Sequence, residues 1–144
     1  MSAEGSGSVS RRRLLDSFAL LSYLNKEIGF EKVREALAEA QASDGSLLMN
    51  EINVGETYYI LHRQRGEQEA GYFLDTVLVG LPILLVQNDF QGVIDAARIK
   101  AEYPLSFGDC FAVATARRES AIILTGDPEF KKIEHLAKIE WLGK

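Results

Sequence analysis

The segment Leu105–Phe130 constrains the fold more than any other part of the chain. It has the pattern of an amphipathic helix, a short apolar strand and an acidic turn, and Asp109 stands near the start of the helix. The residues Ala121–Leu124 are all apolar, which is typical of a strand buried on both faces. Asp127 follows shortly after that strand. Because open α/β sheets bind ligands at the carboxyl ends of their strands, Asp127 stands where such a site would lie.

Predicted strands alternate with predicted helices along the rest of the chain. Further strands are expected at Arg13–Leu15, Leu47–Met49, Ile83–Val86 and, at an edge of the sheet, Lys138–Leu142. Helices are expected at Ser17–Asn25, Phe30–Ala42, Glu51–Arg65, Glu67–Val79 and Phe90–Tyr103, with a short one from Pro128. This alternation predicts an α/β fold with a mainly parallel central sheet of four to five strands and helices on both faces. We expect a single domain over residues 13–144.

The composition of the chain, 144 residues with 47% hydrophobic residues, is that of a soluble globular domain. No apolar run approaches the roughly 18 to 20 residues that span a bilayer. Residues 1–12 lack the apolar core of a signal peptide, and we expect them to be a disordered tail or an addition from cloning. The single cysteine, Cys110, permits no internal disulfide and resembles a small core residue. The expected location is the cytoplasm.

The net charge of −5 argues against binding of nucleic acid through bulk electrostatics. It leaves room for a local basic rim, and basic residues cluster at Arg11–Arg13, Arg63 with Arg65, Arg117 with Arg118, and Lys131 with Lys132. Such clusters are more often solvated surface, so they do not define a site by themselves.

Acidic or amide side chains follow four of the predicted strands, and two predicted helices add further acids. The strand-end residues are Asp16, Asn50 with Glu51, Asn88 with Asp89, and Asp127; the helical ones are Glu56 and Asp109. In a parallel sheet these strand ends point the same way. Asn53 shares a helical face with Glu56, whereas Glu51 points about 140° away from Glu56. Glu51 and Glu56 therefore cannot both reach one point without help from a turn.

Convergent carboxylates carry an energetic cost that suggests a metal ion. Two such charges about 4 Å apart repel by roughly 4 kcal/mol at a surface-like dielectric. Three or four together would take up protons or hold a divalent cation. With two histidines and one cysteine in the chain, oxygen ligands favour Mg²⁺ or Mn²⁺ over zinc. Such ions serve phosphate chemistry, because they bind phosphate oxygens, lower the pKa of an attacking water and stabilise the leaving oxygen.

Four segments, in this order, resemble the acidic motifs of the PIN-domain nucleases. They are LLDSFALLSYL, INVGETYYIL, LSFGDCFAVATA and IILTGDPEF, and the closest likeness is to the VapC-type toxins of bacterial and archaeal toxin–antitoxin pairs. The resemblance covers the chain from Arg13 onward. It implies that the catalytic and metal-binding residues are Asp16, Glu56, Asp109 and Asp127.

The resemblance also has consequences for activity and partners. It implies an endoribonuclease that uses Mg²⁺ or Mn²⁺, is inhibited by a small VapB-type antitoxin and forms a homodimer. Family members often have Asp-Thr-Asn at the first motif. In this chain Ser17 keeps the hydroxyl, but Phe18 replaces the amide, so any contribution of an Asn at that position is lost.

Each candidate residue also has a purely structural interpretation. Asp16 could be a turn residue, Asp109 an acid that complements a helix dipole, and Asp127 a helix cap. Asp89 is expected to be only a helix cap, and Glu51 an exposed acid. The remaining polar and aromatic candidates are Ser17 and Thr125 as hydrogen-bond partners of the carboxylates, Asn50 with no assigned role, His62 and His135 at the surface, and Tyr58 and Tyr59 in core or dimer packing.

Three functional hypotheses follow. The leading one is a divalent-metal-dependent endoribonuclease that cleaves RNA phosphodiesters with metal-activated water and acts as a VapC-like toxin. The second is a catalytically silent module of the same fold that binds RNA or a protein. The third, an aspartyl-phosphate protein with Asp16 as nucleophile, is weak, because phosphatases of that kind need an Asp where Phe18 stands.

Overall fold

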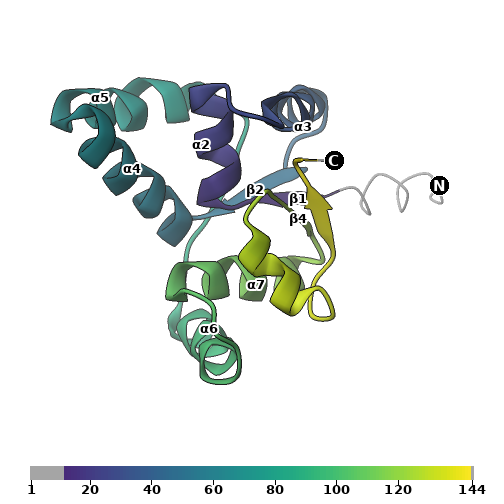
Figure 1. The fold of residues 1–144 in the computed structure, drawn as a ribbon. Helices are drawn as coiled ribbons and strands as arrows, with labels where there is room; N and C mark the ends of the chain where they lie inside the picture. The colour runs from purple at the N-terminus through teal and green to yellow at the C-terminus, as the bar shows by residue number, and fades with distance from the viewer. Residues whose placement is uncertain (1–11, 144) are drawn as a thin grey trace.

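The computed structural model describes residues 12–143 (Figure 1). The prediction of a tail therefore falls almost entirely outside the described residues. Arg12, at its boundary, contacts the domain, because its Nη1 donates to the backbone oxygen of Glu119 at 3.2 Å.

The described residues contain one sheet of five parallel strands in the order β3-β2-β1-β4-β5. The strands are β1 (Arg13–Leu15), β2 (Leu47–Asn50), β3 (Leu84–Val86), β4 (Ile122–Thr125) and β5 (Ile139–Trp141). In the centre, Leu15 pairs with Leu124, and β4 in turn pairs Thr125 with Trp141 of β5. The predicted mainly parallel sheet is confirmed. All five carboxyl ends lie along one edge of the sheet, called the carboxyl edge below.

Helices cover both faces of this sheet, as predicted (Figure 1). The helices are α2 (Ser17–Asn25), α3 (Phe30–Ala42), α4 (Glu51–Arg65), α5 (Glu67–Tyr72), α6 (Phe90–Glu102), α7 (Phe107–Glu119) and the 3₁₀ helix η3 (Pro128–Ile133). Helices α2 to α5 pack on one face, while α6, α7 and η3 pack on the other. Neighbouring strand residues alternate between the two cores, as Leu14 and Leu15 do in β1. The central strands are therefore buried on both sides.

The predicted single helix over Glu67–Val79 is wrong in its second half. After α5 the chain winds as a π-helical turn, η1 (Phe73–Val77), and then as a 3₁₀ turn, η2 (Leu78–Gly80). The β-branched residues of this segment favour an α-helix less than Ala or Leu would. Phe73, the first residue of η1, is almost completely buried in the core.

The edge strand β3 is exposed. Leu84 is 52% exposed and Leu85 is 37% exposed, although both are large apolar residues. Within residues 12–143 no helix is long and apolar enough to cross a membrane.

Candidate active site

Asp16 lies at the carboxyl end of β1 and is almost completely buried, with 1% exposure. Its Oδ1 accepts a hydrogen bond from the Ala19 amide at 2.8 Å, which caps α2, and its Oδ2 accepts one from Thr125 Oγ1 at 2.5 Å. Burial raises the pKa of Asp16 to about 7, because desolvation and the charges of Asp109 and Asp127 outweigh these two hydrogen bonds. The neighbouring carboxylates are thus close enough to affect its ionisation.

Asp109 lies in the first turn of α7, with its amide bonded to the capping Ser106 Oγ at 3.1 Å. Its pKa is raised to about 6, first by burial and then by the charges of Asp127 and Glu56. The four acids implied by the motif resemblance therefore interact at the carboxyl edge. The structure brings them together from β1, α4, α7 and the turn after β4.

Thr125, at the end of β4, joins two of these acids. While its hydroxyl donates to Asp16, its Oγ1 accepts a hydrogen bond from the Asp127 amide at 3.0 Å. Asp127 also caps η3, since its Oδ1 accepts from the Glu129 amide at 3.0 Å. The other proposed hydrogen-bond partner, Ser17, makes no side-chain hydrogen bond to any of residues 12–143, so the supporting hydroxyl is that of Thr125.

Glu56 is held by Asn53, for which the sequence predicts nothing beyond a shared helical face. Asn53 is fully buried, and its Nδ2 donates to Glu56 Oε1 at 2.9 Å and to the backbone oxygen of Gly108 at 3.1 Å. If the side-chain amide of Asn53 were flipped, its oxygen would face two hydrogen-bond acceptors. These two partners therefore determine which side of the amide carries the nitrogen. Asn53 Oδ1 is left buried without a hydrogen-bond partner among the described residues. Asn53 therefore ties α4 to the start of α7, next to Asp109.

Gly108 allows this close approach. A Cβ at this position would lie 1.9 Å from Glu56 Oε2, so the carboxylate occupies the space of the missing side chain.

We expect Gly108→Ala to displace Glu56 and lower any activity of the site by about tenfold or more, as Glu56→Gln would. The free energy of unfolding should change by less than about 1 kcal/mol, because Ala favours a helix. Gly55→Ala is the matched control, since a Cβ on Gly55 meets nothing within 4 Å. Equal activities of the two variants would contradict the role of Gly108.

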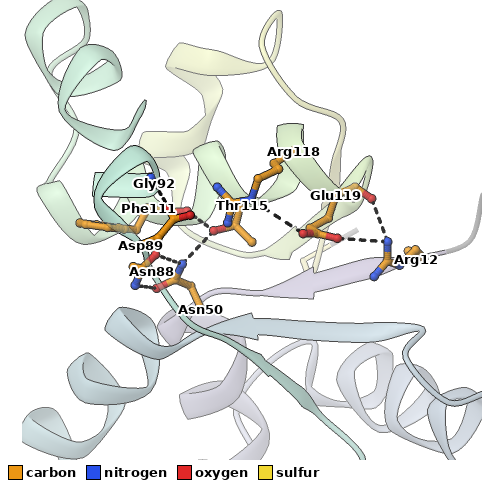
Figure 2. A network of polar contacts seen from close by, with 9 residues as sticks. All are labelled: Arg12, Asn50, Asn88, Asp89, Gly92, Phe111, Thr115, Arg118 and Glu119. Carbon is orange, nitrogen blue, oxygen red and sulfur yellow. Dashed lines mark hydrogen bonds and ion pairs between the residues drawn. The ribbon is translucent and has the colours of Figure 1, made fainter. Parts of the chain in front are cut away.

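The remaining strand-end residues form a separate polar network (Figure 2). Asn50 and Asn88 exchange two amide hydrogen bonds of 2.8 and 2.9 Å, and Asn50 also donates to Thr115 Oγ1 at 2.9 Å. Asp89 caps α6 through the Gly92 amide, as predicted. Glu51 is exposed at the start of α4, whereas the charges that raise the pKa of Asp16 and Asp109 most are those of the other motif acids. This network links the ends of β2 and β3 to α7.

The carboxylate oxygens of the described acids are ligands of the kind that a hard divalent cation such as Mg²⁺ prefers. Their side chains do not, however, surround a single point. Within residues 12–143 no three His, Cys, Asp or Glu side chains are grouped so that they could hold a metal ion. Mg²⁺ requires no closed cage of side chains, because it keeps several of its waters and binds through one or two carboxylates. The raised pKa values of Asp16 and Asp109 show that negative charge is unfavourable here, and a cation would relieve this.

Fold and site together define a parallel α/β domain with an acidic cluster at its ligand-binding edge. The family model of the PIN domain matches residues 13–136. The chain therefore belongs to the PIN-domain family, and the resemblance found in its four motifs is confirmed. No curated protein matches its sequence.

Several solved structures share this fold. The DNA-bound VapBC complex of Salmonella typhimurium has a TM-score of 0.68 and 16% identity over 91% of this chain and 98% of its own. VapBC2 of Rickettsia felis, bound to a DNA fragment from its promoter, has a TM-score of 0.66 and 14% identity over 89% and 96%. VapC20 of Mycobacterium tuberculosis, described as a toxin that cleaves the sarcin–ricin loop, has a TM-score of 0.60 and 17% identity over 83% and 92%. At these identities the similarity establishes the fold.

Proposed function

We propose that the chain is a Mg²⁺- or Mn²⁺-dependent endoribonuclease, the toxin of a VapC-type pair acting in the cytoplasm. The observation that carries the proposal is the buried Asp16 at the carboxyl edge, whose pKa is raised to about 7 by burial and by the nearby charges of Asp109 and Asp127. Burying the Asp16 carboxyl group next to two further acids costs stability. Most acids of a fold lie on its surface, so the arrangement favours a functional role over a structural one.

Each acid has a role in this proposal. Asp16 and Asp109 would bind the cation, with Asp16 fixed in place by Ala19 and Thr125. Asp127 and Glu56 would complete the site directly or through water, and one of these carboxylates would accept the proton of the attacking water. When bound, the cation would supply Lewis-acid activation of the phosphodiester and lower the pKa of that water.

The test measures cleavage of a mixture of small RNAs and compares the rate in Mg²⁺ or Mn²⁺ with the rate in EDTA. Metal-dependent cleavage is expected. Absence of both cleavage and metal binding would favour the second hypothesis, a silent PIN-fold module that binds RNA or protein. If no RNA is cleaved, calorimetry with Mn²⁺ distinguishes the two explanations. A nuclease tested on an unsuitable RNA would still bind Mn²⁺, whereas the silent module would not.

Metal binding should also stabilise the folded chain. At a Mn²⁺ concentration about 100 times its dissociation constant, the free energy of unfolding should rise by about 2.7 kcal/mol. Asp127→Asn should weaken this effect, because it removes one charge from the site, whereas Asp75→Asn, at an exposed position of η1, should not. The measurement is thermal denaturation with and without Mn²⁺. An equal stabilisation of the Asp127→Asn variant would exclude Asp127 from the site.

The proposed partners are a small VapB-type antitoxin and a second copy of the chain. The neighbours in fold include VapBC complexes and the FitAB complex bound to DNA, which supports an antitoxin partner. The exposed leucines of β3, Leu84 and Leu85, support self-association at that edge.

A further inference from the structure

A hollow of about 290 Å³ lies next to the acidic cluster. It is lined by Gly126, Pro128, Lys131, Trp141 and Gly143. Its volume is close to the lower limit of small-ligand pockets, about 300 Å³, and therefore suits one nucleotide unit rather than a folded structure.

Two of the residues around this hollow are connected directly to the site. Gly126 stands between Thr125, which donates to Asp16, and Asp127, whose amide donates to Thr125. Trp141 is the register partner of Thr125 in the pairing of β4 with β5. A ligand in the hollow would thus lie beside the acids.

The lining offers both an aromatic surface and a cation. Trp141 is half-buried, and its Nε1 donates to Glu134 Oε2 at 3.1 Å, which fixes the indole. Lys131 is exposed and forms no ion pair with any of the described residues, whereas the adjacent Lys132 pairs with Glu129. Aromatic rings stack on bases of any sequence, and lysine pairs with phosphate. A side chain at Gly143 would meet nothing within 4 Å, so this part of the lining is open.

A second aromatic ring lies against the same turn. A Cβ on Gly126 would be 2.5 Å from Cε1 of Phe18, so this ring covers the side of Gly126 where a side chain would project. Phe18 is nevertheless 40% exposed, two residues after the buried Asp16. Its ring has no polar atom, so it can contribute only apolar or stacking contacts to a ligand.

We propose that this hollow is a nucleotide subsite. In it, a base of single-stranded RNA stacks on Trp141 while a phosphate of the same strand pairs with Lys131, and Phe18 borders the neighbouring nucleotide. The inference rests on the proposed function, because it takes the acidic edge as the place where the strand is cut. It adds the position of the nucleotide next to the cleaved bond and the residues that hold it.

Trp141 is the only tryptophan in the chain, so its fluorescence reports directly on stacking. The experiment titrates the full chain in EDTA, where no metal-dependent cleavage occurs, with a mixed-sequence ribotetranucleotide. We expect saturable quenching. A tetranucleotide of abasic residues should quench at least about tenfold less well, because it lacks the stacking rings.

Lys131→Gln tests the phosphate contact. It should weaken binding, and the dependence of log K on log salt concentration should become shallower by about 0.7, the value for one phosphate contact to a single strand. Lys132→Gln is the matched control and should change neither quantity, because Lys132 is paired with Glu129 and does not line the hollow. Phe18→Leu should weaken binding of a labelled tetranucleotide, measured by fluorescence anisotropy, while Tyr72→Leu, which changes an exposed aromatic ring on α5, should not.

The proposal would be overturned by absence of quenching, by equal quenching with the abasic strand, or by identical salt slopes for the two lysine variants. Quenching by an acidic peptide but not by the tetranucleotide would overturn it in favour of a protein contact. The RNA cleavage assay is independent of this titration. Cleavage without quenching would reject the subsite and keep the nuclease, whereas quenching with neither cleavage nor Mn²⁺ binding would keep the subsite and reject the nuclease.

Discussion

Asp109→Asn is expected to lower metal-dependent RNA cleavage by about a thousandfold or more while the chain stays folded. The substitution keeps the shape of the side chain but removes one of the charges that would hold the cation. Asp109 accounts for part of the raised pKa of Asp16, so it lies close to the centre of the cluster. The measurements are initial cleavage rates with Mg²⁺ or Mn²⁺ and a thermal denaturation curve of the same preparation.

The matched control for this loss is Asp95→Asn. Asp95 lies on α6, away from the four motif acids in the sequence, and pairs with Arg98 at 3.6 Å. The control should cleave like the wild type. If the Asp109→Asn preparation still cleaved RNA, the activity would belong to a contaminant or to a different site.

The second large effect concerns stability without metal. At pH 7.5 in EDTA, Asp16→Asn should raise the free energy of unfolding by up to about 4 kcal/mol, because folding raises the pKa of Asp16 from 3.8 to about 7 and each tenfold change in a proton-binding constant corresponds to about 1.4 kcal/mol. The amide can still accept from the Ala19 amide and bond to the Thr125 hydroxyl, so the local contacts survive. Only the buried charge is lost. An unchanged or lower stability of both Asp16→Asn and Asp109→Asn would argue against a tight acidic cluster.

The raised pKa of Asp16 also fixes the direction of the pH dependence. Folding raises this pKa from 3.8 to about 7, so between these values the folded state binds more protons than the unfolded state. The stabilisation from this group is complete below about pH 4 and is lost as the pH rises through about 7. The difference in unfolding free energy between Asp16→Asn and wild type should therefore grow from pH 5 to pH 7.5. Denaturant titrations at several pH values in EDTA measure it.

The parts of the fold that follow local patterns could be predicted from the sequence. Alternation of short apolar runs with helices indicated the parallel sheet, and in such a sheet Asp16 and Asp127 must share an edge. The resemblance of the motifs to the PIN-domain family then assigned Glu56 rather than Glu51, and the pKa interactions of Asp109 agree with this choice.

Other features depend on contacts between distant segments. The bond from Asn53 to the Gly108 carbonyl joins residues 55 positions apart, and no local pattern specifies it. The amide pair of Asn50 and Asn88 depends on how β2 and β3 align. The π-helical turn at Phe73 was not predicted either; its first residue packs in the core, and helix propensity is only a weak guide where such tertiary contacts are made.

The hydrogen bond from Thr125 to Asp16 joins residues 109 positions apart in the chain. During synthesis, Asp16 would leave the ribosome long before β4 and the turn that carries Asp127. An incomplete chain would therefore contain Asp16 and Glu56 without their partners, and β1 without one of its two neighbouring strands. Contacts of such sequence separation form late and slowly. If the proposed nuclease is correct, a nascent toxin would remain harmless until β4 and the turn with Asp127 had been synthesised, which gives an antitoxin time to bind.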